Sequence, residues 1–199
     1  MILFFNEDIL IAKAEDIEKW HFKLLKDATE NGMLDSKVIS IEEDKTWLKS
    51  KIEMIRSQPC FKLIYRASED GFTTEAFHKR CDNRGATLMV ANTNLGILGG
   101  FTIQPWDSSL TVAEVDPKSL IFELKTRKLT LPAKSMGTEI PTGALAGPTF
   151  GINLQIGVNY HTGKASGTIA EGIWRVLQNS LHYNVYPIAV VDLEVFQVV

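Results

Sequence analysis

Two adjacent glycines, Gly99 and Gly100, lie within the run ILGGFTI, which otherwise has the composition of a β-strand. Glycine weakens a strand because it loses more backbone entropy than other residues and has no side chain to pack. The pair therefore indicates either a phosphate-binding loop or a backbone that a bulky side chain approaches closely. A phosphate-binding loop opens a helix, and no helical pattern follows Gly100. We therefore expect the glycines to make room for a bulky neighbour such as Phe101 or Trp106.

Several β-prone runs follow one another in pairs along the chain. The runs are CFKLIYR (60–66), ATLMVA (86–91), ILGGFTI (97–103), SLIFELK (119–125), KLTLPA (128–133), INLQIGV (152–158) and PIAVVDLEVFQVV (187–199). The second and third runs are joined by a short polar connection, which predicts a hairpin, and the fourth and fifth predict another pair. In the first run, alternation predicts that Phe61, Leu63 and Tyr65 share one side of a strand.

The first part of the chain has a helical pattern instead. Apolar residues at three- and four-residue spacing predict an amphipathic helix over residues 14–30. Ser40 followed by Glu43 is a capping box, and the apolar stripe after it predicts a second helix that continues towards residue 59. We therefore expect an N-terminal helical segment over residues 1–58 and one domain over residues 59–199.

Two more helices are expected within that domain. Thr73 is suited to be the N-cap of a short helix that ends before Gly85. Thr168 with Glu171 forms another capping box and predicts a helix over residues 169–182. Paired strands with helices before and after them indicate an α+β fold with antiparallel sheets rather than a βαβ repeat.

Composition narrows the classes of protein to which the chain can belong. With 199 residues, of which 45% are hydrophobic, the chain is long enough to bury a compact core. Its net charge of −3 gives no general attraction to nucleic acid. An apolar run of about 20 residues, which a membrane span needs, is not found in the sequence. The two cysteines, Cys60 and Cys81, do not form a disulfide framework, so we expect a reducing, cytoplasmic location.

A thiol site is the first catalytic candidate. His78 and Cys81 are one helical turn apart, which allows an imidazole to activate a thiolate. The alternative is that Cys81 is a small core residue and His78 an exposed one. The remaining histidines are too scattered for a recognisable metal site, and we expect neither a metal nor a cofactor. The segment GVNYHTGKAS (157–166) approaches a nucleotide-binding loop, but its spacing differs and a polar loop is expected.

Loop residues give the binding candidates. Acidic and polar groups at 69–70, 82–84 and 107 are expected in loops, where recognition residues concentrate. A nucleic-acid site would require scattered basic residues to converge on one face. Those residues are Lys62, Arg66, Lys79, Arg80 and Arg84.

Motifs from residue 60 onwards resemble the TLDc domain family. They are D-G-F (70–72), C-D-x-x-G (81–85), G-G-F (99–101), W-D (106–107), G-P-T-F-G (147–151) and the terminal VVDLEVFQV. The resemblance spans about residues 60–199. The residues that it marks as motif positions are Gly71, Phe72, Cys81, Gly85, Gly99, Gly100, Phe101, Trp106, Gly147, Phe150, Gly151, Glu194 and Phe196.

The resemblance implies a two-sheet antiparallel β-sandwich flanked by helices, without established catalytic residues. TLDc proteins are associated with resistance to oxidative stress, and several bind the vacuolar-type proton ATPase. It therefore implies a non-catalytic domain that binds a protein partner and gives protection against oxidative stress. The alternatives are a thiol-dependent redox enzyme that uses Cys81 with His78 and, third, a nucleic-acid-binding regulator. The oligomeric state stays open.

Overall fold

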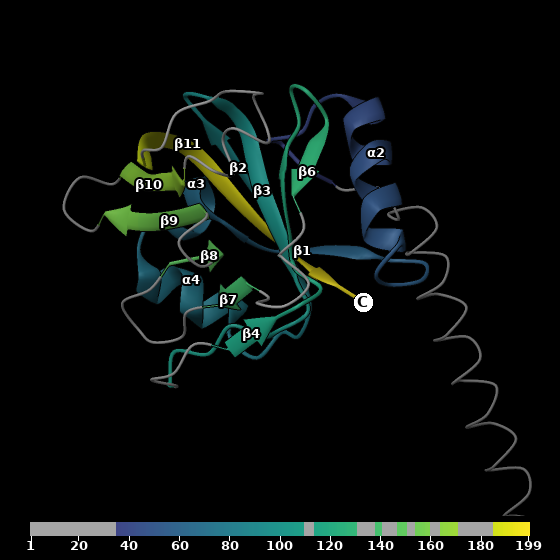
Figure 1. Ribbon diagram of the computed structural model, residues 1–199. Coiled ribbons are helices and arrows are strands. Elements are labelled where there is room, and N and C mark those ends of the chain that lie inside the picture. The colour runs from purple at the N-terminus through teal and green to yellow at the C-terminus, as the bar shows by residue number, and fades with distance from the viewer. Residues whose placement is uncertain are drawn as a thin grey trace, which may run out of the picture.

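The computed structural model describes residues 35–109, 114–130, 138–140, 147–150, 154–159, 164–170 and 185–199. The helix expected over residues 14–30 lies outside this part. The described helices are α2 (Glu42–Glu53), α3 (Ala67–Asp70) and α4 (Thr74–Cys81). They lie around a long antiparallel sheet, so the α+β class is confirmed (Figure 1).

The sheet is one continuous path of antiparallel strands in the order β6-β5-β3-β2-β11-β10-β9-β8, and β1 also pairs with β11. The strands are β1 (Phe61–Arg66), β2 (Thr87–Thr93), β3 (Gly96–Thr102), β5 (Leu120–Glu123), β6 (Lys128–Thr130), β8 (Thr149–Phe150), β9 (Leu154–Asn159), β10 (Lys164–Ala170) and β11 (Val185–Val198). The expected hairpin is confirmed as β2–β3, and the second expected pair as β5–β6. β4 (Glu114–Asp116) and β7 (Thr138–Ile140) form a separate pair. Among the described strands, the second sheet of a sandwich is not shown.

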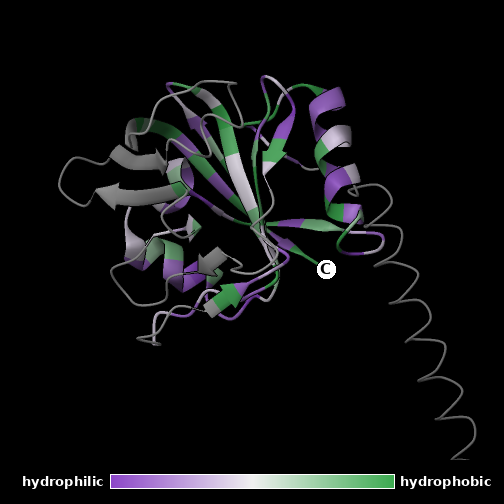
Figure 2. Ribbon diagram, in the orientation of Figure 1, coloured by the Kyte–Doolittle hydropathy of each residue, from purple (hydrophilic) through white to green (hydrophobic). Residues whose placement is uncertain are grey.

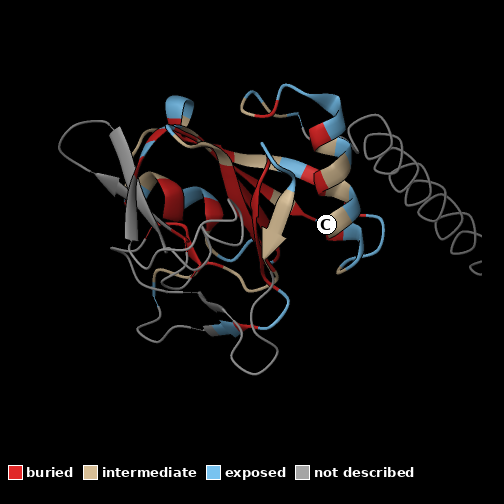
Figure 3. Cartoon of the chain, turned by 45° about the horizontal axis from the view of Figure 1, so that its top comes forward, coloured by how far each residue is buried: buried red, intermediate tan, exposed pale blue. Residues whose placement is uncertain are grey.

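The central strands are buried on both faces (Figure 3). Alternate residues of β2 and β11 belong to two apolar clusters, one on each face of the sheet. We call them the α2 face and the Trp106 face. The α2 face contains Leu48, Ile52, Leu88, Val90, Phe101, Phe122, Phe196 and Val198, among others. The Trp106 face contains Tyr65, Phe77, Cys81, Met89, Ala91, Trp106, Phe150, Leu193 and Val195, among others.

The second helix docks on the sheet. Leu48 and Ile52, four residues apart on α2, are fully buried in the α2 face together with Ile39. α2 also carries hydrophilic residues between its apolar ones (Figure 2). The prediction of a capping box at Ser40 and Glu43 is wrong, because the N-cap is Ile41 and its side chain makes no capping hydrogen bond. The helix ends at Glu53, well before residue 59.

Two further expectations are wrong, one for a helix in the second half of the chain and one for the side of β1 on which Tyr65 lies. The helix expected over 169–182 begins instead as strand, since β10 runs to Ala170 and pairs Ile169 with Tyr186. β-branched residues suit a strand, and β11 offers its edge there. Residues 171–182 lie outside the described part. In β1, a register shift between Leu63 and Tyr65 marks a bulge, so Tyr65 lies on the Trp106 face while Phe61 and Leu63 lie on the α2 face.

The glycine pair makes room for aromatic rings, as expected, but the rings belong to other residues than those expected. A Cβ atom at Gly100 would lie 2.6 Å from the ring of Phe150. At Gly99 it would lie 2.2 Å from the carbonyl oxygen of Met89 and 2.3 Å from the ring of Phe122. Each glycine therefore serves one face of the sheet, and the neighbours are not Phe101 or Trp106.

We predict that Gly100→Val destabilises the protein by about 3 kcal/mol, because the buried ring of Phe150 has to move. Chemical denaturation measures the free energy of unfolding. In a double-mutant cycle, the same substitution should cost less in a Phe150→Leu background, because the smaller side chain frees space. Equal costs in both backgrounds would show that Phe150 is not the obstacle.

Candidate functional site

The thiol candidate lies inside the core. Cys81 is fully buried at the end of α4, and burial raises the pKa of its thiol. The neutral thiol is a weak nucleophile. His78 is only 8% exposed, so the expectation that it is exposed is wrong. Its Nδ1 lies 2.7 Å from Oδ1 of Asp82, and its ring contacts Phe77 edge to face. The expectation that Cys81 is a core residue is confirmed.

Two of the motifs meet at Trp106. Asp82 forms an isolated parallel bridge with Trp106, and its Oδ2 accepts a hydrogen bond from the backbone N–H of Ser108 at 2.9 Å. The indole Nε1 of Trp106 donates to Oγ1 of Thr87 at 2.9 Å. The ring also contacts Phe77 and Phe150 edge to face. The C-D-x-x-G and W-D motifs therefore hold α4 against the sheet.

The remaining motif residues that the structure describes lie in turns or in the apolar core. Gly71 follows α3 with a φ of +104°, and its carbonyl accepts a hydrogen bond from the hydroxyl of Tyr65. Gly85 has a φ of +70°, which favours glycine. Phe72 packs against the Trp106 face. Phe101 and Phe196 are buried in the α2 face. Phe150, in β8, is buried in the Trp106 face, and Gly147 is buried just before β8. Gly151 lies outside the described residues.

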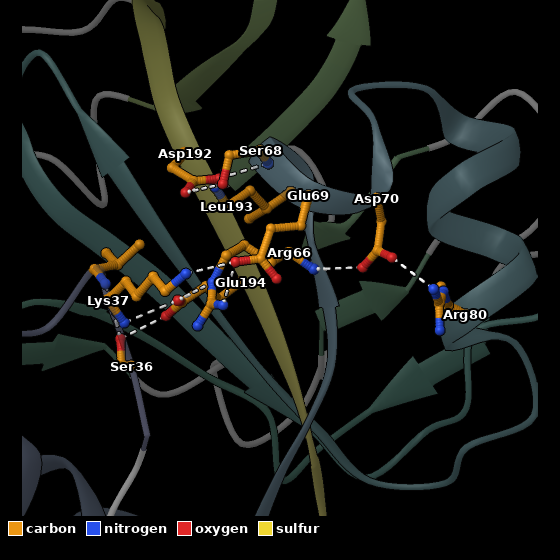
Figure 4. A network of polar contacts seen from close by, with 11 residues as sticks. Ser36, Lys37, Arg66, Ser68, Glu69, Asp70, Arg80, Asp192, Leu193 and Glu194 are labelled. Atoms are coloured by element: carbon orange, nitrogen blue, oxygen red, sulfur yellow. Dashed lines mark hydrogen bonds and ion pairs between the residues drawn. The ribbon is translucent and has the colours of Figure 1, made fainter.

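Glu194 stands apart from these motif residues because it is a fully buried carboxylate. Its Oε1 accepts hydrogen bonds from Nε of Arg66 at 2.8 Å and from the backbone N–H of Lys37 at 3.0 Å. Its Oε2 accepts one from the hydroxyl of Ser36. Glu194 thereby joins β11, β1 and the segment before α2. We call Ser36, Lys37, Arg66, Ser68, Glu69, Asp70, Arg80, Asp192 and Glu194 the Arg66 cluster (Figure 4).

The rim of the Arg66 cluster is exposed. Glu69, about half exposed, pairs with both Arg66 at 2.8 Å and Lys37 at 2.6 Å. These hydrogen bonds, first from Lys37 and then from Arg66, lower the pKa of Glu69. Burial alone would lower the pKa of Arg66, but its hydrogen bonds to Glu194 and Glu69 raise it overall. Both directions favour the charged forms of Glu69 and Arg66 near neutral pH.

Further hydrogen bonds extend the Arg66 cluster on both sides. Asp70 accepts hydrogen bonds from the backbone N–H of Arg66 and from the guanidinium of Arg80. Ser68 donates both its backbone N–H and its hydroxyl to Asp192. The D-G-F motif thus helps to anchor α3 between β1 and β11. Such an arrangement fixes segments in place and presents charges of both signs at its rim.

Sequence reasoning marked Glu194 only as a motif residue and Arg66 only as one of several scattered cations. A signal was available in the alternation of β11. Glu194, Phe196 and Val198 occupy alternate positions of β11, and Phe196 and Val198 belong to the α2 face. A carboxylate at such an inward position requires a buried partner. The identity of that partner could not be read from the sequence.

Two of the five basic residues proposed for nucleic acid are paired with carboxylates of the same chain. Arg66 is buried against Glu194, and Arg80 is paired with Asp70. Among the residues that the structure describes, no group of three or more His, Cys, Asp or Glu side chains is placed to hold a metal ion. Within the same ranges, no helix has the length and apolar character needed to cross a bilayer.

The fold is an α+β domain. In it, hydrogen bonds of the Arg66 cluster hold the segment before α2, β1 and α3 against β11. A comparison with protein-family models matches the TLDc domain over residues 33–199, and the chain therefore belongs to the TLDc family. The match includes α2, which the sequence analysis had assigned to the N-terminal segment. A search of curated proteins gave no match.

We predict that Glu194→Gln destabilises the protein by about 3 kcal/mol, because it leaves the buried guanidinium of Arg66 without its buried carboxylate. The matched control is Glu69→Gln, which removes an exposed partner of the same arginine and should cost much less, because solvent screens an exposed pair. Urea denaturation of both variants gives the comparison. Similar costs would show that burial of Glu194 is not the deciding factor.

We also predict that only one thiol reacts in the folded protein. Cys60 is partly exposed, whereas Cys81 is fully buried with a raised pKa. Alkylation at neutral pH, followed by mass spectrometry, should modify Cys60 alone, and both cysteines in denaturant. Rapid labelling of Cys81 in the native protein would support a thiol enzyme.

Proposed function

We propose that this chain is a non-catalytic binding module of the TLDc β-sandwich type, with another protein as its partner and protection against oxidative stress as its role. The vacuolar-type proton ATPase is the partner that the family resemblance suggests. The observation that carries the proposal is that the reactive groups of the family motifs are used within the fold. Among these motif groups, Cys81 is buried with a raised pKa, and Glu194 is bonded to Arg66.

The exposed rim of the Arg66 cluster supports a binding role. Lys37, Glu69 and Arg80 have side chains that are at least half exposed, and they lie around the same short helix, α3 (Figure 4). Charges of both signs at fixed positions select a complementary partner and exclude others. We propose that this rim contacts the partner protein. A cytoplasmic location is part of the proposal, and the two unpaired cysteines support it.

A thiol-dependent redox enzyme is supported less well. Its nucleophile would have to be Cys81, whose burial and raised pKa disfavour the thiolate. A nucleic-acid-binding regulator is also supported less well, because Arg66 and Arg80 are neutralised by carboxylates. The first alternative depends on a buried thiol, and the second on cations of which two are already paired within the protein.

We predict that the immobilised chain binds the purified peripheral sector of a vacuolar-type proton ATPase, and that Lys37→Ala/Glu69→Gln weakens binding about tenfold or more, equivalent to about 1.4 kcal/mol. The exposed pair contributes little to stability, so the melting temperature should change little. Lys118→Ala, which removes an exposed lysine outside the cluster, is the control. Absence of binding by the unmodified chain would refute this choice of partner, and equal loss in the control would refute the rim.

A cellular test separates binding from thiol chemistry. Cells that lack the chain should survive hydrogen peroxide less well, and a Cys81→Ala variant that folds should restore survival, because a binding module needs no thiolate. Loss of rescue by a folded Cys81→Ala variant would favour the redox enzyme.

A further inference from the structure

The loop that follows α4, residues 82–85, is fixed to the rest of the domain by its backbone. The N–H of Asn83 donates a hydrogen bond to the carbonyl of Trp106 at 2.9 Å. Nε2 of Gln197 donates one to the carbonyl of Arg84, also at 2.9 Å. Asn83 has a φ of +58°, a left-handed conformation that asparagine adopts more readily than most residues. The loop is therefore held in one conformation although most of it is exposed.

The side chain of Arg84 is exposed and is oriented by the helix before it. Nε of Arg84 donates a hydrogen bond to the carbonyl of Arg80, in the last turn of α4, at 3.1 Å. This bond satisfies one of the carbonyl groups that a helix leaves without a partner at its C-terminus. It uses only Nε, so the guanidinium is held in place while its terminal N–H groups point outward from the bond.

The carboxylates of this region are bonded to other groups. Asp82, in the same loop, has its Oδ1 2.7 Å from Nδ1 of His78. Asp70 accepts a hydrogen bond from the guanidinium of Arg80 at 2.7 Å. The ion pairs of the part of the chain that the structure describes do not include Arg84. Arg84 therefore presents an uncompensated positive charge on a fixed loop.

A second cation, Lys62, lies beside the loop. Lys62 on β1 is directly opposite Gln197 on β11, so the two side chains project from the same face of the sheet with Cβ atoms about 5 Å apart. Lys62 is exposed, and it too forms no ion pair within the described ranges. Because Gln197 bonds the carbonyl of Arg84, the three residues follow one another across the surface. They place an amide between two cations.

This row of groups suits carboxylates on an extended chain. A guanidinium matches a planar carboxylate with two parallel hydrogen bonds, whereas an ammonium attracts a charge without fixing its orientation. Cations in a row favour successive acidic side chains over one phosphate group. A nucleic acid is also a row of anions, but the net charge of −3 disfavours the approach of a long polyanion. A short acidic segment needs only local complementarity.

We propose that Arg84, Lys62 and Gln197 form a binding site for an extended acidic segment of another protein. Arg84 binds one carboxylate of the segment through its terminal nitrogens, and Lys62 attracts the next. Gln197 keeps the loop in position between them. Because the loop and the guanidinium are fixed before binding, less conformational entropy is lost. The inference rests on the proposed function in one respect, that the partner is a protein, and it adds the chemistry of that partner.

Titration of the full, isotope-labelled chain with a peptide of six glutamates tests this site by NMR. We predict chemical-shift changes concentrated at residues 82–85, Lys62 and Gln197. Arg84→Gln/Lys62→Gln should weaken the affinity about tenfold or more, because both cations are lost. Lys118→Gln, which removes an exposed lysine outside the site, is the matched control and should leave the affinity unchanged.

Two single variants separate recognition from folding and from general charge. Lys62→Gln leaves the loop intact and should still weaken binding about threefold. Arg84→Lys keeps the charge but not the fork of donors, so it should also lower the affinity, whereas a general charge effect would leave it unchanged. Thermal unfolding of each variant shows that it is folded.

Three results would overturn the proposal. They are absence of binding of the glutamate peptide by the unmodified chain, equal affinity in the double variant, and tighter binding of a strand of six thymidines at the same residues. Failure of the peptide alone, with ATPase binding that depends on Lys37 and Glu69, would refute this site and leave the proposed function. Peptide binding that depends on Arg84, without ATPase binding, would refute only the choice of the ATPase.

Discussion

The structure depends on one strand that is hydrogen-bonded along both edges. β11 pairs with β2 on one edge, and with β1 and β10 on the other. Its side chains alternate between the two apolar faces, and a bulge between Val190 and Asp192 shifts this alternation. The helices and the outer strands can bury their apolar residues only because this strand presents two faces. Burial on both faces is also why β2 lacks the polar alternation of a surface strand.

A fully buried central strand makes any charge within it costly, and Glu194 shows how that cost is met. Desolvation of the carboxylate is offset by three hydrogen bonds, one of them from Arg66. Two of the donors belong to the segment that leads into α2. The buried charge thus fixes where the N-terminal part of the family domain meets the sheet. This connection explains physically why α2 belongs to the domain although its sequence differs in character from the strands that follow.

The distribution of polar groups also bears on the function of the protein. Within the described residues, the carboxylates of the motifs mostly bind backbone N–H groups or nearby cations, and Cys81 is sealed in the core. Chemistry at Cys81 would require local unfolding, whereas the rim of the Arg66 cluster is already exposed.

The sequence by itself determined the features that depend on local chemistry. These include the β2–β3 hairpin, the N-cap at Thr73, the burial of Cys81, and the use of Gly99 and Gly100 to make room. Only the tertiary structure decided which rings fill that room, which side of β1 Tyr65 occupies, and that Thr168 and Ile169 continue a strand. The same holds for the pairing of Arg66 with Glu194, residues 128 positions apart. Local patterns fix turns and caps because their partners are neighbours in the chain, whereas bulges, strand edges and buried ion pairs depend on partners that only folding brings together.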